Sequence, residues 1–387
     1  MSVEGVRGDL GGDGTPGLAG PAGAGVRPPG GGRPIDEDKV RRIALEVWRF
    51  KQGEMVSLMI HLGDRLGLYR AMVGAGPVDA AELAAQTDLA ERWVREWLLS
   101  QAAAGLVRSN DGEHFELPPE AVPVLADDRT SLWFAAGAFH GYSASPEVVD
   151  ALAEAFRSGV GLSYDQLGPA AAHQVERMLG PWTRLALVAE IIPALKGIGE
   201  RLRSGGRVAD VGCGTGLAVF ALADAFPASF VEGFDPSAHA IDVAERRLAE
   251  TELTNVTFHR LPAAALPDEA TFDLVMTLDC LHDMPRPEEA ARAIRAAIRP
   301  DGAWLIKEIK AGETWAENSK NPVLAMMYAT SVATCMSSAL SEPGGAGLGT
   351  LGMTRSRAEQ MCSSAGFSSF EVHEFPDPAN VYFEVRP

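Results

Sequence analysis

The sequence predicts an α/β protein in which a doubly wound parallel sheet follows an α-helical N-terminal module. Three observations support this fold class. A buried strand at 208–211 runs through a glycine turn into an apolar helix at 217–225. Strands and helices then alternate toward the C-terminus, as a mostly parallel sheet requires. Before residue 200, the apolar residues follow helical spacing instead.

Composition sets the class of protein. The 387 residues are 46% hydrophobic and carry a formal net charge of −18, which suits two or three globular domains. The average field repels nucleic acid and anionic membranes, so we expect neither as a partner. Four scattered cysteines without a C-x-x-C pair indicate reduced thiols and no zinc site. With no spanning apolar run and no signal-peptide core, a cytoplasmic location is expected.

We divide the chain into four segments. Residues 1–34 contain 12 glycines and 5 prolines and are expected to be a disordered tail. Residues 35–125 are predicted to be a winged-helix-like dimerisation domain. Residues 126–200 are predicted to be a helical connector and pocket wall, and residues 201–387 the ligand-binding α/β domain.

The first helices predict a homodimer. An apolar stripe at helical spacing includes Val40, Ile43, Val47 and Trp48. The next segment, 54–72, is apolar nearly all round at its start, and a small module cannot easily cover it alone. We therefore expect these helices to pack against a partner subunit. Contact with the α/β domain of the same chain is the alternative.

Residues 77–120 are predicted to form helix, turn, helix and wing. Short and longer helices at 77–84 and 90–103 precede a hairpin with a D-G turn at 111–112. Trp93, Val94, Trp97 and Leu98 are expected to face inward. The segment resembles the winged-helix module in front of many bacterial and plant O-methyltransferases. Residues 109–120 have four acidic residues and no Lys or Arg, whereas a DNA reader needs a basic face.

The connector is predicted to contain helices at 131–138, 146–158, 171–179 and 182–195. Its aromatic residues and one histidine are candidates for a pocket wall, with ordinary core packing as the alternative for each. These residues are Trp133, Phe134, Phe139, His140, Tyr142, Tyr164 and Trp182.

A glycine turn is the ligand-binding element on which the functional prediction depends. Asp210, Gly212, Gly214 and Gly216 give the pattern D-x-G-x-G-x-G directly after a buried strand. Glycines adopt positive φ and lack a Cβ, so backbone NH groups at the helix start can meet an anionic group. A dinucleotide fold would require a third glycine at position 217, where the chain has Leu217.

The next strand, 230–235, adds a second acid. Asp235 ends this strand, and a carboxylate there can accept both hydroxyls of a ribose. With these acids, the glycine pattern resembles the class I S-adenosylmethionine (SAM) dependent methyltransferases from about residue 180 to the end. The resemblance implies a Rossmann-like, seven-stranded sheet and SAM as cofactor. It also implies that Pro236 and Asp279 line the cofactor site together with Asp210, Asp235 and the three glycines.

One feature departs from that family. Many SAM enzymes place an acid just past the third strand, here expected at 255–259, to contact the adenine amine. This chain has Pro262 at that place. Adenine recognition is therefore expected to rest on backbone groups or apolar packing.

The acceptor side is predicted from the end of the fourth strand, 271–279. The run Leu281-His282-Asp283 follows it, and a helix starts at Pro287. Ligands bind at the carboxyl ends of such strands. The run resembles the small-molecule O-methyltransferases, including plant phenylpropanoid and bacterial polyketide enzymes. That resemblance implies His282 as general base, Glu308 near the end of strand 303–309 as its orienting acid, and Asp283 as the acid that holds the acceptor. A histidine that only packs against the sheet is the alternative.

The C-terminal part completes the predicted fold. Residues 313–352 are expected to be an insertion with a helix and a mobile loop that closes over substrate. A helix at 355–365, capped by Thr354, precedes the last strands at 370–373 and 381–385.

These observations predict a SAM-dependent methyltransferase that acts on a hydroxyl of a small, largely apolar molecule and needs no metal ion. Two alternatives remain open. The first is a SAM-binding winged-helix regulator without catalysis. The second is C- or N-methylation, because the donor half of the site would look the same.

Overall fold

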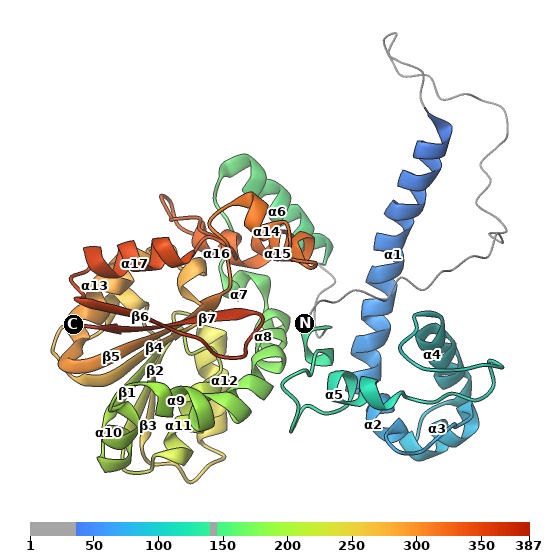
Figure 1. Cartoon of the computed structure of the whole chain (residues 1–387), viewed down its shortest axis with the longest axis horizontal. Coiled ribbons are helices and arrows are strands. Elements are labelled where there is room, and N and C mark those ends of the chain that lie inside the picture. Colours follow the sequence, from blue (N-terminus) through green and yellow to red (C-terminus); the bar gives the residue numbers. More distant parts are fainter. Residues whose placement is uncertain (1–35, 140–144) are drawn as a thin grey trace. The chain divides into compact units, whose positions relative to one another are not determined.

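The computed structural model describes residues 36–139 and 145–387 (Figure 1). The predicted tail at 1–34 and two predicted pocket residues, His140 and Tyr142, lie outside this part of the chain. The protein divides into two compact units, Met1–Ser57 and Leu58–Pro387.

The first unit, where described, is the start of a long helix. The helices predicted over 40–48 and 54–72 are α1 (Glu37–Arg65) and the short α2 (Leu68–Met72), separated by Gly67 at φ 73°. The predicted apolar stripe is exposed along α1: Ile43 is 65% and Trp48 is 58% exposed. Exposed aliphatic and aromatic side chains in one row are typical of an interaction surface.

The winged-helix segment forms largely as predicted. Helix α3 (Ala80–Thr87) begins with a capping box between Asp79 and Glu82, and α4 (Glu91–Ala103) follows. Backbone bridges join Arg108 to Glu116 and Val78 to Phe115, which closes the wing. The inward orientation predicted for Trp93 is wrong, because this side chain is 81% exposed while Val94, Trp97 and Leu98 are buried. Helical spacing places Trp93 at the edge of the apolar stripe of α4, and the buried face is formed by the other three residues.

The connector differs from the prediction at its start. Residues 131–138 do not form the predicted helix; a short 3-10 turn, η2 (Ala136–Phe139), is present instead. The later helices are α6 (Pro146–Ser158), α7 (Tyr164–Leu167), α8 (Pro169–Trp182), η3 (Thr183–Ile191) and α9 (Ile192–Ala194). From α8 to α9 the helical conformation continues, so the break predicted between 179 and 182 is absent. Pro181 lies inside α8, and η3 widens to π-helical geometry directly after it.

The α/β domain contains a seven-stranded sheet, as predicted. Its order is β3-β2-β1-β4-β5-β7-β6, in which β7 is antiparallel to both of its neighbours and the other pairs are parallel. The strands are β1 (Arg207–Val211), β2 (Phe230–Phe234), β3 (Val256–His259), β4 (Phe272–Leu278), β5 (Ile298–Ile309), β6 (Ser369–His373) and β7 (Asn380–Arg386). Because the chain moves outward from β1 in one direction and then from β4 in the other, the two strands flank the switch point of the sheet.

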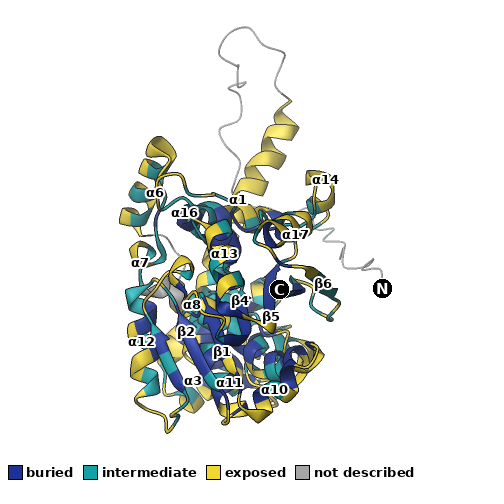
Figure 2. Ribbon diagram, turned by 90° about the vertical axis from the view of Figure 1, so that its left-hand side faces the viewer, coloured by how far each residue is buried: buried dark blue, intermediate teal, exposed yellow. Residues whose placement is uncertain are grey.

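Helices cover both faces of this sheet, and two apolar cores result. One core joins the sheet to α9, α10 (Ile198–Ser204), α11 (Leu217–Ala225) and α12 (Ala238–Leu248). The other joins it to α13 (Pro287–Ala297) and α17 (Arg355–Ser364). Figure 2 shows the buried strands between helices whose outer faces are exposed. This rigid frame fixes the loops at the carboxyl ends of β1, β2 and β4.

The insertion at 313–352 is more helical than predicted. It contains α14 (Trp315–Asn318), α15 (Leu324–Thr330), η6 (Ser331–Cys335) and α16 (Met336–Ala339). It is tied to the fourth strand's loop, since Gly349 NH donates to His282 O at 3.1 Å. Among the described helices, no single one is long and apolar enough to cross a membrane. One bent pair, 173–194 with 198–204, passes that test by length and composition.

Candidate active site at the carboxyl edge of the sheet

The candidate site lies where β1, β2 and β4 end, next to the switch point of the sheet. Parallel strands deliver their following loops to one edge, so the predicted donor and acceptor residues come together there. The two halves touch directly. Cys280 Sγ donates to Val211 O at 3.1 Å, and a Cβ on Gly212 would lie 2.8 Å from that sulfur.

The glycine turn has the positive φ values that the sequence predicted, but the NH groups of its three glycines are not free for a ligand. They donate to Phe234 O at 2.8 Å, to Asp235 Oδ2 at 2.9 Å and to Cys213 O at 3.0 Å. Gly212, Gly214 and Gly216 have φ values of 77°, 53° and 83°. A Cβ on Gly216 would lie 2.7 Å from the Phe258 ring, whereas a Cβ on Gly214 would meet nothing within 4 Å. Gly214 therefore borders open space, so no side chain keeps a ligand from approaching its backbone.

Asp235 holds the turn from the second strand. Its Oδ2 accepts from Gly214 NH at 2.9 Å, and its Oδ1 accepts from Ser237 NH at 2.8 Å. Burial raises the pKa of Asp235, and the two backbone donors partly oppose that rise. The adjacent Pro236 is exposed. The arrangement leaves a partly buried carboxylate beside the cradle at Gly214.

Asp210 has a buried carboxylate oxygen that accepts no hydrogen bond from the described residues. The side chain is buried at 2% exposure, and Oδ1 has no hydrogen-bond partner within the described chain. Burial, and secondarily the charge of Asp235, raise the pKa of Asp210 to about 7. A buried unpaired carboxylate beside a second one is costly unless a cation joins them. This orphaned oxygen and the open cradle fit a ligand that carries positive charge, as SAM does on its ammonium and sulfonium groups.

Asp279 is engaged inside the protein. It adopts positive φ, 55°, directly after β4. Its carboxylate accepts hydrogen bonds from Lys307 Nζ and Asn380 Nδ2. The Lys307 ammonium lies 4.7 Å from the centre of the Trp182 ring. The side chain predicted to contact the cofactor is therefore neutralised by a buried lysine, and its contact with a cofactor stays a prediction.

His282 and Glu308 form the buried pair that the sequence predicted. His282 belongs to the 3-10 turn η5 (Leu281–Asp283), and Glu308 lies near the end of β5. His282 Nδ1 lies 2.6 Å from Glu308 Oε2, and Leu281 NH donates to Oε1 at 2.9 Å. A carboxylate at Nδ1 fixes the neutral ring with its proton on Nδ1, which leaves Nε2 as a base.

The same pair determines the charge of the ring. Burial alone would lower the pKa of His282. The Glu308 charge and the interactions of the ring with Cys335 and with the Glu308 carboxylate, which accepts from it, outweigh burial, so the pKa of His282 is raised well above its usual value. The ligand-free site thus favours imidazolium next to carboxylate.

Asp283 is the third predicted acceptor-side residue. Its Oδ2 accepts a 2.8 Å hydrogen bond from the Tyr164 hydroxyl. Burial raises the pKa of Asp283 to about 7, against the opposing effects of His282 and Tyr164. Asp283 thus sits between protonated and ionised near neutral pH, where it can either donate to or accept from a bound molecule.

Two functional contacts were missed from the sequence. Tyr164 was predicted only as pocket lining, and Cys335 had no predicted role. Cys335 ends η6, which packs against η5, and it is one of the groups that raise the pKa of His282. Both partners lie more than fifty residues away along the chain, and no local spacing signals such a contact. Of the other predicted pocket residues, Trp133 is 72% exposed and Phe134 is buried, and a pocket-wall role for either stays a prediction.

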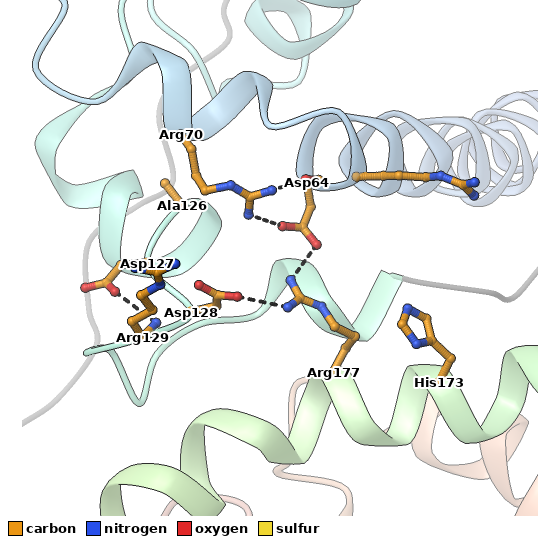
Figure 3. A pocket seen from close by; sticks show the side chains of 9 residues that line it. Asp64, Arg70, Ala126, Asp127, Asp128, Arg129, His173 and Arg177 are labelled. Carbon is orange, nitrogen blue, oxygen red and sulfur yellow. Dashed lines mark hydrogen bonds and ion pairs between the residues drawn. The ribbon is translucent and has the colours of Figure 1, made fainter. Parts of the chain in front are cut away.

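A charged cavity of about 780 Å³ lies apart from these residues (Figure 3). Arg177 bridges two carboxylates there, at 2.8 Å from Asp64 Oδ2 and 2.9 Å from Asp128 Oδ2. Arg70 donates to Asp64 Oδ1 at 2.8 Å. Because the charges neutralise one another, this cavity is a salt-bridge network and not a candidate for acid–base chemistry.

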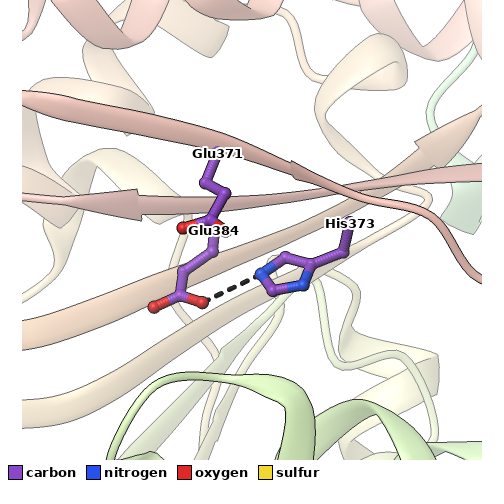
Figure 4. Close-up of side chains that lie close together, drawn as sticks. All are labelled: Glu371, His373 and Glu384. Atoms are coloured by element: carbon purple, nitrogen blue, oxygen red, sulfur yellow. Dashed lines mark hydrogen bonds and ion pairs between the residues drawn. The ribbon is translucent and has the colours of Figure 1, made fainter.

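A second acidic cluster joins the last two strands. Glu371, His373 and Glu384 lie close together on β6 and β7 (Figure 4). His373 Nε2 is 2.9 Å from Glu384 Oε2, and Arg386 Nε donates to Glu384 Oε1 at 2.7 Å. Arg386 competes with any metal ion for Glu384, so we assign no metal to this cluster.

Comparison with known proteins identifies both domains. Residues 202–366 match the methyltransferase domain family, and residues 54–127 match the family of Rv2258c-like winged HTH domains. The resemblance inferred from the glycine turn and from the wing is confirmed.

Curated relatives match over part of their length. The chain is 31% identical over 104 residues to the ubiquinone biosynthesis O-methyltransferase of Paraburkholderia xenovorans, covering 26% of this chain and 43% of that protein. It is 33% identical over 103 residues to the 27-O-demethylrifamycin SV methyltransferase of Amycolatopsis mediterranei, covering 26% and 38%. The chain thus spans about two fifths of the length of the curated relatives it matches.

Solved structures agree in fold over nearly the whole chain. Human N-acetylserotonin methyltransferase, solved in complex with SAM, has a TM-score of 0.61 at 18% identity and covers 89% of this chain and 97% of its own. An O-methyltransferase family protein from Burkholderia thailandensis has a TM-score of 0.61 at 16% identity, covering 89% and 98%. At these identities the likeness confirms the predicted fold class and nothing finer.

Proposed function

We propose that this chain, which joins a winged helix-turn-helix domain to a methyltransferase domain with the class I SAM fold, catalyses SAM-dependent methylation of a hydroxyl group on a small, largely apolar molecule. The single observation that carries the proposal is the buried His282–Glu308 pair. His282 lies two residues after Cys280, whose side chain is next to Gly212 in the glycine turn. A cradle for a cationic donor and a base beside it are the two parts that methyl transfer to oxygen requires.

The acceptor oxygens of Asp210 and Asp235 support SAM as the ligand of the donor half. When bound, SAM supplies an electrophilic methyl group on a sulfonium. The Gly214 backbone would approach it closely because no side chain intervenes. Asp210 would accept from the ammonium group, which removes the cost of its unpaired oxygen, and Asp235 would accept from the ribose hydroxyls. Four carboxylates around the site, at 210, 235, 283 and 308, also favour a cationic ligand over an anionic one.

The acceptor half has a base whose orientation is fixed. A phenol has a pKa of about 10 and a histidine about 6.5, so a neutral imidazole does not deprotonate the acceptor beforehand. It accepts the proton as the oxygen attacks, which contributes typically ~10²- to 10⁴-fold. Glu308 stabilises the imidazolium that forms. His282 Nε2 lies on the edge of the ring opposite to the Nδ1 contact with Glu308, and we assign it as the atom that takes the proton.

Two experiments test the proposal. Isothermal titration with S-adenosylhomocysteine (SAH) should show 1:1 binding, and no binding at high micromolar ligand would overturn it. A metabolite panel screened with labelled SAM then supplies an acceptor. His282→Ala should lose turnover by at least ~10²-fold and keep SAH binding. His114→Ala, on the exposed wing, is the matched control and should change neither. Unchanged turnover in His282→Ala would remove the base.

The same proposal includes a homodimer. Within residues 36–57, Phe50 is 69% exposed in addition to Ile43 and Trp48. A row of exposed large apolar groups on one helix is stable in water when a second copy covers it. Sedimentation should give a dimer for the whole protein and a shift toward monomer for Trp48→Asp. A wild-type monomer at micromolar concentration contradicts this part.

The winged helix-turn-helix match favours a second candidate, a SAM-binding regulator that contacts DNA. The charge argues against it, since Arg92 on α4 is paired with Glu96 and the wing is acidic. Salt-sensitive, sequence-specific DNA binding by the purified protein would favour the regulator over the enzyme.

A further inference from the structure

Thr215 lies between Gly214 and Gly216, and its side chain attaches the glycine turn to two helices. The hydroxyl donates to Glu176 Oε2 on α8 at 3.1 Å and accepts from Arg247 Nη1 on α12 at 3.3 Å. Thr215 is buried at 8% exposure, where a hydrogen bond is stronger than in water. The turn is therefore held from outside through this hydroxyl.

Glu176 and Arg247 form a closed ring of hydrogen bonds with that hydroxyl. Arg247 Nη2 donates to both carboxylate oxygens of Glu176, at 2.7 and 2.8 Å. Hydrogen bonds between two charged groups are stronger than those between neutral groups. The Glu176 side chain is 17% exposed, so solvent screens the pair only in part. Glu176 is thereby held in the position from which it accepts from Thr215.

The next residue of α8, Arg177, contacts an earlier part of the chain. Its Nη2 lies 2.8 Å from Asp64 Oδ2 at the end of α1, and its Nη1 lies 2.9 Å from Asp128 Oδ2 (Figure 3). The guanidinium carbon also lies 5.4 Å from the centre of the Phe134 ring. Successive residues of a helix point roughly 100° apart. Helix α8 therefore contacts the glycine turn through Glu176 and the end of α1 through Arg177.

We propose that Glu176 is a positioning residue for the SAM site, and that Arg177 couples the position of Glu176 to the contacts of α8 with the N-terminal part of the chain. The three glycines make the turn costly to order, because glycine loses more conformational freedom on folding than any other residue. Asp235 holds the turn at Gly214, and Glu176 holds it at the next residue. The turn is thus ordered before a ligand arrives, so binding does not bear that cost.

Glu176 acts on the ligand through the shape of the turn. Its described hydrogen bonds go to Thr215 and Arg247, and Arg177 in turn acts through the placement of α8. The inference rests on the proposed function in one respect, because SAM is the ligand whose affinity is raised. The ordering of the turn by Glu176 does not depend on which ligand binds.

Matched substitutions test the positioning role by SAH titration of the full-length protein. Thr215→Val keeps the size of the side chain and removes the hydroxyl, whereas Thr215→Ser keeps the hydroxyl. Binding should be about 10-fold weaker in Thr215→Val and in Glu176→Gln, and within about 2-fold of wild type in Thr215→Ser. The double variant Glu176→Gln, Thr215→Val should bind no more weakly than either single variant. Glu190→Gln, at an exposed position, is the control and should bind as wild type does.

Hydrogen exchange measures the order of the turn without any ligand. Peptides that cover residues 212–217 should exchange at least ~10-fold faster in Glu176→Gln and Thr215→Val than in wild type and Thr215→Ser. Peptides from α13 should exchange at the wild-type rate in every variant. This second region separates local loosening of the turn from loss of the fold.

Arg177→Met tests the coupling. It should weaken SAH binding by about 3- to 10-fold in the wild-type background. In the Glu176→Gln background it should change the affinity by less than about 2-fold, because the contact through which it acts has already been lost. If circular dichroism shows that Arg177→Met does not fold, Asp128→Asn takes its place, since it removes one of the two carboxylate partners of Arg177 and leaves the other.

The outcomes separate this inference from the proposed function. Wild-type SAH affinity and wild-type exchange in Glu176→Gln would overturn the positioning role and leave the proposed function standing. Equal weakening by Thr215→Ser and Thr215→Val would overturn the role of the hydroxyl. An effect of Arg177→Met that persists in the Glu176→Gln background would overturn the coupling. Faster exchange in Glu176→Gln, together with no SAH binding by the wild type, would support the ordering of the turn and contradict the proposed function.

Discussion

The Tyr164 hydroxyl donates a 2.8 Å hydrogen bond to Asp283 Oδ2, across 119 positions of sequence. The next residue, Asp165, accepts from Ser237 Oγ and, at 3.1 Å, from Ala238 NH at the start of α12. The four-residue helix α7 therefore connects the acceptor side of the site to the loop after Asp235, the acid that we propose binds the ribose. A segment outside the sheet thus sets the distance between the two halves.

Tyr164→Phe should lower the stability of the protein without weakening cofactor binding. The change removes the only donor described for Asp283 Oδ2, and a buried carboxylate left without a donor costs about 1–3 kcal/mol. We expect a lower urea midpoint and unchanged SAH affinity by calorimetry. Tyr328→Phe, on a half-exposed ring, is the control and should stay within about 0.5 kcal/mol of wild type. Equal stability of the two variants would contradict the role of Tyr164.

The strands of the α/β domain could be predicted from the sequence because each is signalled by residues that are adjacent in the chain. Short apolar runs end at glycines or acids, and these ends fall at one edge of a parallel sheet. Strand β5 starts earlier than predicted, at Ile298, since Ile298 pairs with Phe272 before an irregularity in register. The connector was less predictable. Ser131–Ala138 has helical spacing but no helix, because packing against neighbours overrides weak propensity.

The candidate site divides in the same way. Asp210 and Glu308 lie near the ends of strands, Asp235, His282 and Asp283 follow strands, and all five were predictable by position. The partners of the acidic side chains were not predictable, because Tyr164 reaches Asp283 and Lys307 reaches Asp279 only after the chain is folded. Spacing in sequence carries no information about such contacts, and one sequence gives no co-variation to reveal them.

Gly214→Ala should separate cofactor binding from folding. Gly214 has φ 53° with open space where a Cβ would stand, so alanine costs only the strain of that conformation, about 1 kcal/mol, and fills the cradle. SAH affinity should fall at least ~10-fold. Gly197→Ala is matched, since Gly197 has φ 74° and also meets nothing within 4 Å. It should lose similar stability and keep SAH affinity. Equal SAH affinity in the two variants would show that the cradle lies elsewhere.

Lys307 should be required for folding through Asp279. Lys307 is 1% exposed and neutralises the buried Asp279 carboxylate. Removing one partner of a buried ion pair leaves an uncompensated charge and costs about 3–5 kcal/mol. Lys307→Met should therefore unfold at a markedly lower urea concentration. The double variant Lys307→Met, Asp279→Asn should recover part of the loss, and an unchanged deficit in the double variant would contradict the pairing.

Asp210 predicts a pH dependence of SAH binding. Its folded-state pKa, about 7, exceeds the unfolded value of 3.8, so the folded protein keeps a proton that the unfolded chain has lost. Stability of the ligand-free protein therefore falls as the pH rises from about 4 to about 7. We propose that the SAH ammonium contacts the ionised form of Asp210. SAH should therefore bind more tightly at pH 8 than at pH 6, and binding at pH 6 should release a proton.

Asp210→Asn should remove that dependence and lower SAH affinity by about 10- to 100-fold, the equivalent of one charge-assisted hydrogen bond. Calorimetry at both pH values, in two buffers of different ionisation enthalpy, measures affinity and proton release together. Asp224→Asn, on the exposed side of α11, should behave as wild type. Proton release that persists in Asp210→Asn would assign the titration to another group.

Glu308→Gln should move the titration of His282 to lower pH. Burial lowers the pKa of His282, and the Glu308 charge raises it by more, so removal of the charge leaves burial unopposed. The wild-type pKa lies above the unfolded value of about 6.5. The pair therefore stabilises the fold fully below that unfolded value, and the contribution is lost as the pH rises through the folded pKa. ¹⁵N-histidine NMR, assigned with His282→Asn, measures the pKa in the ligand-free protein.

The same shift should appear in catalysis, because only neutral His282 accepts a proton. In wild type, kcat/KM should rise with pH through the raised pKa of His282 and then level off. In Glu308→Gln the rising limb should lie at lower pH, and the plateau should be at least ~10-fold lower, since the imidazolium formed during transfer has lost its carboxylate. Glu371→Gln, on an exposed strand position, is the control and should keep the wild-type profile. A limb that stays in place in Glu308→Gln, with the NMR titration shifted, would mean that a group other than His282 takes the acceptor's proton.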